Sequence, residues 1–162
     1  MVEARRAAAG AALGLVLALG AAAPAAPPEK PAPVTVSILS VQATKEAEPS
    51  CDPALEPIRT ALARSGYNTF RLLKRDSRAV QPDQSVECPM AEDYALRVKA
   101  ERADKDNVKM CITWVRHEKD QEGKPKAVVL QRIPLTIRNG KHFLSGGWKL
   151  EKGAVLGAVA GQ

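Results

Sequence analysis

The chain has few of the residues from which base-stacking surfaces and metal centres are built. Its 162 residues include two Phe, two Tyr, two Trp, two His and three Cys. So few aromatic rings make a single-strand nucleic-acid binder a poor expectation, because such proteins stack successive bases on a series of rings. None of the soft ligands are paired at the short spacing of zinc sites; these ligands are Cys51, Cys88, Cys111, His117 and His142. We expect no metal, no cofactor and no nucleic-acid partner.

Catalytic motifs are absent from the sequence too. It has no Gly-x-Ser-x-Gly elbow and no paired carboxylates at helical spacing on a common face. LTIRNGKHFLSGGWKLEKG (residues 135–153) is rich in glycine and lysine, but it lacks the Walker spacing and no helix pattern follows it. Asn139-Gly140 instead predicts a type I′ hairpin turn, because both residues tolerate positive φ. We therefore name no catalytic residue.

Charge of one sign does not dominate the chain. The formal net charge is +6, but acids are interspersed with the bases, which favours an ordinary solvated surface. Binding of a polyanion by the basic surface stays open as an alternative. A second alternative is a small hydrolase with Cys111 or Cys88 as its nucleophile.

Long apolar runs are missing except near the N-terminus. Glu3, Arg5 and Arg6 precede an uncharged, Ala-rich run that ends in small residues, a pattern typical of a secretory signal peptide. Its strongly apolar part (residues 11–19) is shorter than the roughly 20 residues that span a bilayer. We predict a signal peptide over residues 1–25 and export to the periplasm or the exterior, with an uncleaved membrane anchor as the alternative.

The remainder of the chain is predicted to form a short spacer and one domain. APPEKPAP (residues 26–33) is proline-rich and should be extended. Residues 34–162 have the length of a single domain that can bury a core. No transmembrane segment is expected in the mature chain.

One helix is predicted, over residues 50–66. Leu55, Ile58 and Leu62 recur at helical spacing, and Gly66 suits the stop. Asp52 and Pro53 suit the start, but Pro57 would break an interior turn, so the first residue of the helix stays open. Leu62 should be buried, with Arg59 and Arg64 in water.

Strands are predicted for most of the remaining residues. Alternating patterns mark strands at residues 34–41, 69–74, 85–88, 94–101, 108–115, 127–138, 142–144 and 154–160, and residues 117–126 read as a charged loop. The link at residues 103–107 predicts a hairpin, and Pro134 predicts an edge strand. The fold class is thus α+β: one helix packed on a twisted antiparallel sheet of about six to eight strands, which could curl into a half-barrel.

The aromatic residues divide into core and candidate site. Phe70, Tyr94 and Trp114 lie on apolar strand faces and should be core. Trp148 follows two glycines beside Lys149 and Lys152, and these three residues are the candidate contact for a partner. The alternative is that Trp148 folds back to cap the core.

Disulfide bonding between Cys88 and Cys111 is not expected. The strand at residues 94–101 should lie between them, so two interstrand steps place their Cα atoms about 10 Å apart. A disulfide needs less than about 7 Å. Any internal bridge should involve Cys51.

Three stretches carry a resemblance to a known group. YNTFRLL (67–73), LTIRNGKHFLSGG (135–147) and GAVLGAVAG (153–161) resemble small exported bacterial domains of unknown function with a YxxFxLL … NGxxFLxGG pattern. The group tends to have an LPxG turn where this chain has CPMAED (88–93), and it supplies no functional residue. Export and the lack of catalytic motifs lead us to expect a non-catalytic binding or structural module, an accessory component of a cell-envelope assembly, with another envelope protein as its partner.

Overall fold

The described part of the protein is built from two largely antiparallel sheets and one short helical segment. The structure, a computed structural model, describes residues 24–28 and 30–162. The predicted signal peptide lies almost wholly outside these residues. Residues 24–28 and 30–33, where the spacer is predicted, are exposed and form neither helix nor strand.

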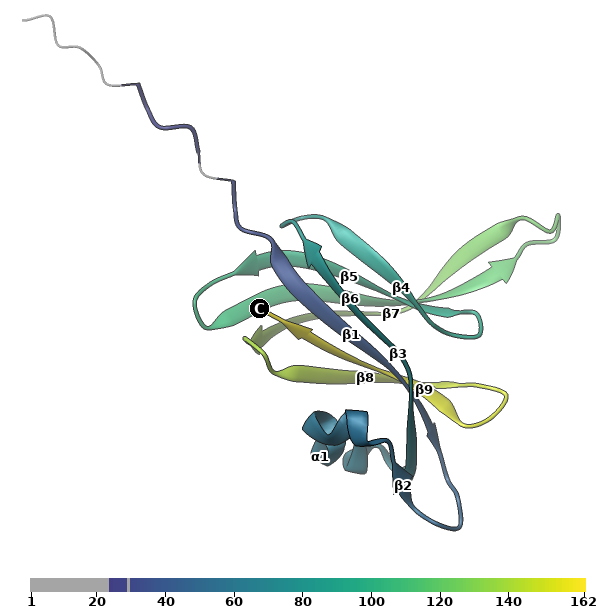
Figure 1. Cartoon of the computed structure of the whole chain (residues 1–162). Coiled ribbons are helices and arrows are strands. Elements are labelled where there is room, and N and C mark those ends of the chain that lie inside the picture. The colour runs from purple at the N-terminus through teal and green to yellow at the C-terminus, as the bar shows by residue number, and fades with distance from the viewer. Residues whose placement is uncertain (1–23, 29) are drawn as a thin grey trace, which may run out of the picture.

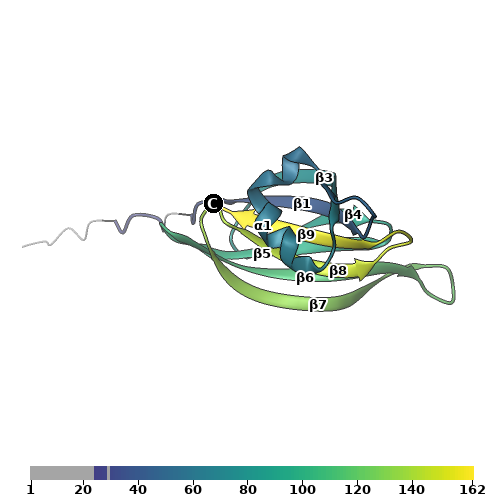
Figure 2. The same ribbon diagram turned by 90° about the horizontal axis from the view of Figure 1, so that it is seen from below.

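The two sheets pack face to face, and the helical segment covers the outer face of one of them (Figures 1 and 2). The five-stranded sheet has the order β2-β3-β1-β9-β8 and the four-stranded sheet the order β4-β5-β6-β7. The strands are β1 (Val34–Thr44), β2 (Ser50–Cys51), β3 (Thr69–Val80), β4 (Ser85–Ala91), β5 (Tyr94–Ala103), β6 (Asn107–Lys119), β7 (Pro125–Arg138), β8 (His142–Lys149) and β9 (Ala154–Gly161). The predicted α+β class with antiparallel pairing is confirmed. The single curled sheet is wrong, because the strands divide into two sheets.

Two hydrophobic clusters hold the three layers together. The larger lies between the sheets and includes Val36 and Ile38 from β1 and Met110 and Trp114 from β6. Ser40 donates a buried hydrogen bond of 2.7 Å across this interface to the carbonyl oxygen of Met90. The smaller cluster joins the helical segment to the five-stranded sheet. Its members are Leu39, Val41, Ala43, Leu55, Ile58, Leu62, Phe70, Leu156 and Ala158.

β9, like its neighbour β1, contributes side chains to both clusters. All eight of its residues are buried, because the helical segment lies on one face and the four-stranded sheet on the other. Gly157 shows how close the approach is: a Cβ there would lie 2.9 Å from Cζ2 of Trp114 and 3.0 Å from Cε of Met90. The sequence AVLGAVAG therefore matches a strand with little space on either side.

The helical segment is shorter and more irregular than predicted. A 3₁₀ helix spans Pro53–Ile58, the α-helix α1 only Arg59–Leu62, and a second 3₁₀ turn Ala63–Ser65. Pro57 lies in the first 3₁₀ helix, which accounts for the late start of α1. The predicted caps are confirmed: the Asp52 side chain accepts from the backbone N–H of Ala54, and Gly66 ends the segment at φ 85°.

Two sequence predictions about connections are wrong. Half of the charged loop predicted at residues 117–126 is strand, because β6 continues to Lys119 and β7 begins at Pro125. The two strands pair in a hairpin that projects beyond the other strands (Figure 1). The Asn139-Gly140 turn does not close a hydrogen-bonded hairpin either. It carries the chain from β7 in one sheet to β8 in the other.

Hydrogen bonds outside a hairpin ladder explain how this turn is held. The side chain of Asn139 donates to the carbonyl oxygen of Lys105 (2.8 Å), and the N–H of Gly140 donates to that of Gly161 (3.0 Å). Gly140 has φ 73°, but Asn139 is not among the residues with positive φ, so the turn is not type I′. The turn is thus fixed to the β5–β6 turn and to the end of β9.

The helical segment yields the first prediction. Leu62 is fully buried against the five-stranded sheet, and Arg64 is exposed. Leu62→Ala should lower the free energy of unfolding by about 2–4 kcal/mol through lost transfer energy and a cavity. Arg64→Ala should change it by less than about 0.5 kcal/mol. Urea unfolding of both variants measures this, and equal losses would mean that the buried face is misassigned.

Candidate functional site

Trp148 is half-buried and packs onto the core at the end of β8. Its ring meets the buried ring of Trp114 edge to face, with centroids 6.4 Å apart and planes at 63°. Nε1 of Trp114 donates to Oγ of Ser145 at 3.0 Å, whereas the buried Nε1 of Trp148 has no protein partner in the described residues. Trp148 therefore caps one side of the core while keeping part of its ring in solvent. The core positions predicted for Phe70 and Trp114 are confirmed.

The two lysines predicted beside Trp148 lie over different hollows. Lys149 lines a hollow of about 640 Å³ at the base of the projecting hairpin, together with Tyr94, Arg116 and His117. Lys152 lines another, of about 820 Å³, at the far end of β1. The structure thus places Trp148 and Lys149 side by side in β8 and separates Lys152 from them.

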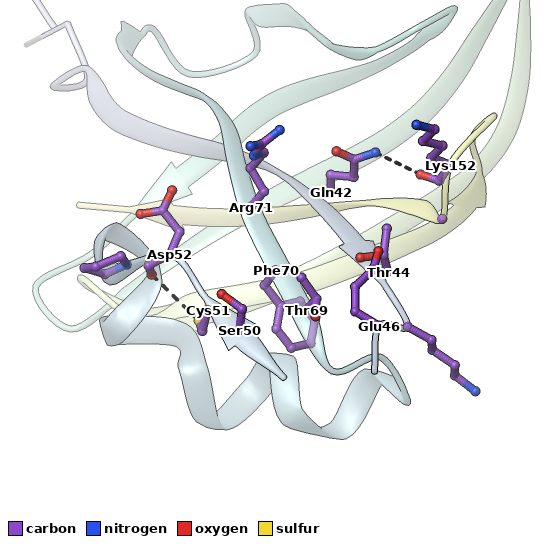
Figure 3. A pocket seen from close by; sticks show the side chains of 13 residues that line it. Gln42, Thr44, Glu46, Ser50, Cys51, Asp52, Thr69, Phe70, Arg71 and Lys152 are labelled. Carbon is purple, nitrogen blue, oxygen red and sulfur yellow. Dashed lines mark hydrogen bonds between the residues drawn. The ribbon is translucent and has the colours of Figure 1, made fainter. Parts of the chain in front are cut away.

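The hollow around Lys152 is polar and has structural hydrogen bonds in its wall (Figure 3). The Gln42 side chain donates to the Lys152 carbonyl oxygen at 2.9 Å. The Asp52 carboxylate accepts from the backbone N–H groups of Ala54 and Leu72. Burial is the main cause that raises the pKa of the Cys51 thiol beside it. The Asp52 carboxylate is already engaged in a helix cap, and the raised pKa keeps Cys51 mainly in its unreactive thiol form. This pair is therefore unsuited to nucleophilic catalysis.

The other two cysteines are on opposite faces of the four-stranded sheet. β5 lies between β4 and β6, as the sequence predicted, with Cys88 opposite Leu96 and Cys111 opposite Lys99. Cys88 therefore faces the core, where burial raises the pKa of its thiol. Cys111 points to the outer face. All three cysteines are free, so Cys51 forms no bridge.

An ionic group crosses the outer face of the four-stranded sheet. Arg97 donates two hydrogen bonds to Oε2 of Glu87, at 2.7 and 3.1 Å, and Nε2 of His117 lies 2.9 Å from Oε1 of Glu87. Burial by itself would raise the pKa of Glu87, but the hydrogen bonds from Arg97 and His117 outweigh it and lower this pKa. Between these groups lie Ala95 and Val115, which are buried although they face outward.

The sandwich is open on the side between β7 and β8. Each of these strands is the last of its sheet, and the two are not hydrogen-bonded to each other. Figure 2 shows β7 bowing away from the body below β8. Six large apolar side chains on these two strands pack against the core but are only partly buried: Leu130, Ile133, Leu135, Ile137, Phe143 and Trp148. We call these six residues the apolar stripe.

Exposed bases are frequent on the strands that carry the apolar stripe. Residues 123–150 contain no Asp or Glu and six bases: Lys124, Lys126, Arg132, Arg138, Lys141 and Lys149. All six are exposed. Across the part of the chain that the structure describes, only Lys124 of the six has a carboxylate within 4.0 Å. Strand alternation places Arg132 and Arg138 on the outer face of β7, away from the apolar stripe, and Lys149 shares its hollow with Glu92, Asp93 and Glu118. Lys141 and Lys149 lie at the two ends of β8 and are the bases next to its free edge.

Sequence reasoning found one residue of the apolar stripe, Trp148, and missed the rest. Leu135 and Ile137 were read as one arm of a hairpin with Phe143 in the other, a pairing that would have covered them. The missing acids in residues 123–150 were a visible signal. The separation of β7 from β8 was not, because it depends on which sheet each strand joins.

No family model, no curated protein and no solved structure matches this chain. Within residues 24–28 and 30–162 there is no cluster of three or more His, Cys, Asp or Glu side chains that could hold a metal ion. The same residues include no helix with the length and apolar character needed to cross a membrane.

The Glu87 group gives a prediction about pH. A carboxylate with a lowered pKa in the folded state stabilises the fold above its unfolded pKa, near 4.5, and this contribution is lost as the pH falls through the folded pKa. The free energy of unfolding should therefore fall more steeply below pH 4.5 in the parent protein than in Glu87→Gln. Denaturant titrations between pH 7 and pH 3 measure the two slopes.

Glu122 supplies the matched control for this titration. It is an exposed carboxylate at the tip of the β6–β7 hairpin, paired only with Lys124. Glu122→Gln should keep the acid slope of the parent protein. Identical slopes for the parent and Glu87→Gln would contradict the role given to the Arg97–Glu87–His117 group.

Proposed function

We propose that this protein is an exported, non-catalytic binding module that serves as an accessory component of a cell-envelope assembly. The observation that carries the proposal is the open side of the sandwich. Six partly buried apolar side chains line two strand edges that no other described strand covers, with Lys141 and Lys149 at the ends of β8. A monomeric protein has no structural reason to leave such a surface uncovered. Aromatic anchors such as Trp148 at such a surface are typical of protein interfaces.

Export is supported by the N-terminal sequence. The charged start, the short apolar run and the small residues up to residue 25 fit a secretory signal, and the proline-rich residues 26–33 would set the domain apart from it. The resemblance to small exported bacterial domains points the same way. The partner would then be another protein of the envelope.

The geometry of the cysteines favours binding over the hydrolase alternative. Cys88 is buried, with a raised pKa, so its reactive thiolate form is scarce. Cys111 and His117 share one face of β6 but lie six residues apart, about 20 Å along a strand. A Cys–His pair needs hydrogen-bond contact between the two side chains.

Polyanion binding is the second candidate, supported by the exposed cations of residues 123–150. It makes a different prediction from protein binding. Attraction that rests on cations alone would fall steeply with salt and would not depend on the apolar stripe.

Site-directed photo-crosslinking of the full chain tests the proposal. A photoreactive residue in place of Lys149 should form adducts with one envelope protein, identified by mass spectrometry. The same residue in place of Arg64, exposed on the helical segment, should not. Adducts that are absent from Lys149, or equal from both positions, would contradict a binding function for the open side. Fractionation of the cells that express the full chain tests export, which predicts the protein in the periplasm or the medium.

A further inference from the structure

We propose that the open side takes one extended, acidic strand of the partner, which pairs with the free edge of β8 and covers the apolar stripe. This inference rests on the proposed function and narrows the partner to a chemical class. Three features of the described residues lead to it: a free strand edge, apolar side chains on both faces of that edge, and an exposed lysine at each end of it.

The free edge of β8 is the better of the two available edges. β8 pairs with β9 alone, and its register is regular from His142 to Ser145 before the bulge at Gly146–Trp148. This stretch has no proline, so every residue keeps its backbone N–H. β7 also has a free edge, but Pro125 and Pro134 remove donors from it. A strand added to β8 can therefore form a continuous short ladder.

Apolar contacts are available on both faces of such a strand. Phe143 and Trp148 of β8 pack with the core between the sheets, where the apolar stripe continues along β7. Leu144 points the other way and packs with the smaller cluster under the helical segment. Successive side chains of an added strand point to opposite faces. One set would cover the apolar stripe, and the other, which carries the acids, would lie on the solvent-facing side beside Leu144.

The cations favour an acidic strand and argue against a second copy of this chain. Lys141 and Lys149, at the two ends of β8, are exposed, and neither has an ion pair within the described part of the structure. Two copies meeting edge to edge would bring these like charges together, which costs free energy. Asp or Glu side chains at the solvent-facing positions of an added strand would pair with them.

An anionic lipid would also match the charge, but it needs a cavity for its acyl chain. The two largest hollows described, of about 820 and 640 Å³, are lined mainly by polar and charged residues and by none of the apolar stripe. The interior beneath the stripe is filled by Trp114, Met110 and other fully buried side chains. An extended strand needs only an edge and a row of side chains.

The test uses a synthetic nine-residue peptide in which Glu or Asp alternates with Val or Ile. Titrated into the full chain, it should shift the backbone amide resonances of His142–Ser145 and change the emission of Trp148. A peptide of the same composition with its acids and apolar residues in two blocks should bind at least tenfold more weakly. So should an alternating peptide with N-methylated backbone nitrogens, which cannot complete the ladder.

Charge reversal locates the site. The double variant Lys141→Glu, Lys149→Glu should bind the alternating peptide at least tenfold more weakly, whereas Lys45→Glu, on the exposed β1–β2 connection, should bind as the parent does. Amide spectra of each variant report whether the fold is kept. Equal binding of all three peptides, or shifts outside β7 and β8, would overturn the inference.

The remaining outcomes separate this inference from the proposed function. Binding to phosphatidylglycerol vesicles with no response to the alternating peptide would overturn it in favour of a lipid surface. If Lys149 cross-links to an envelope protein while all three peptides fail to bind, the binding function is supported and the inference of an added acidic strand is contradicted. If the cross-linking also fails, both the binding function and the added strand are contradicted.

Discussion

The rest of the structure depends on the tight packing of β9 between the helical segment and the four-stranded sheet. A strand buried at all eight positions can carry only small side chains where its neighbours are large. Trp114 and Met90 fill the space that a side chain at position 157 would need, and Met110 lies 2.8 Å from the Cβ position of Gly161. These glycines let the four-stranded sheet approach from one side while the helical segment covers the other.

The two sheets approach each other closely at the centre of the sandwich, but they stay together on only one of its two sides. β3 leads into β4 through a turn at Gln81–Gln84 and joins the sheets on one side. On the other side the turn at Asn139-Gly140 links β7 to β8, but the strands then separate into different sheets. The apolar stripe is left partly exposed there, and residues 123–150, which include all of it, contain exposed bases but no acid. The proposed binding function and the proposed acidic strand both follow from this asymmetry.

Local features of the fold could be predicted from sequence because they depend on neighbouring residues. The N-cap at Asp52, the stop at Gly66, the β5–β6 hairpin and the burial of Leu62 are all of this kind. The division into two sheets could not be predicted, since the same alternating pattern suits one curled sheet or two flat ones. For the same reason Asn139-Gly140 wrongly predicted a β7–β8 hairpin. The hydrogen bond that helps to hold this turn joins Asn139 to Lys105, which is 34 residues away in the sequence. The position of Trp148 outside the alternating pattern marks it in the sequence, whereas Leu130 and Ile133 lie inside a predicted strand and carry no such signal.

Hydrogen exchange of the free protein tests most directly whether the side between β7 and β8 is open. Backbone amides of β9 are paired on both sides and buried, whereas those of β8 that point away from β9 have no partner strand. The account predicts slow exchange throughout Ala154–Gly161 and alternating fast exchange along His142–Ser145. Uniform slow exchange along His142–Ser145 would show that another part of the chain already covers this edge, and would contradict the account.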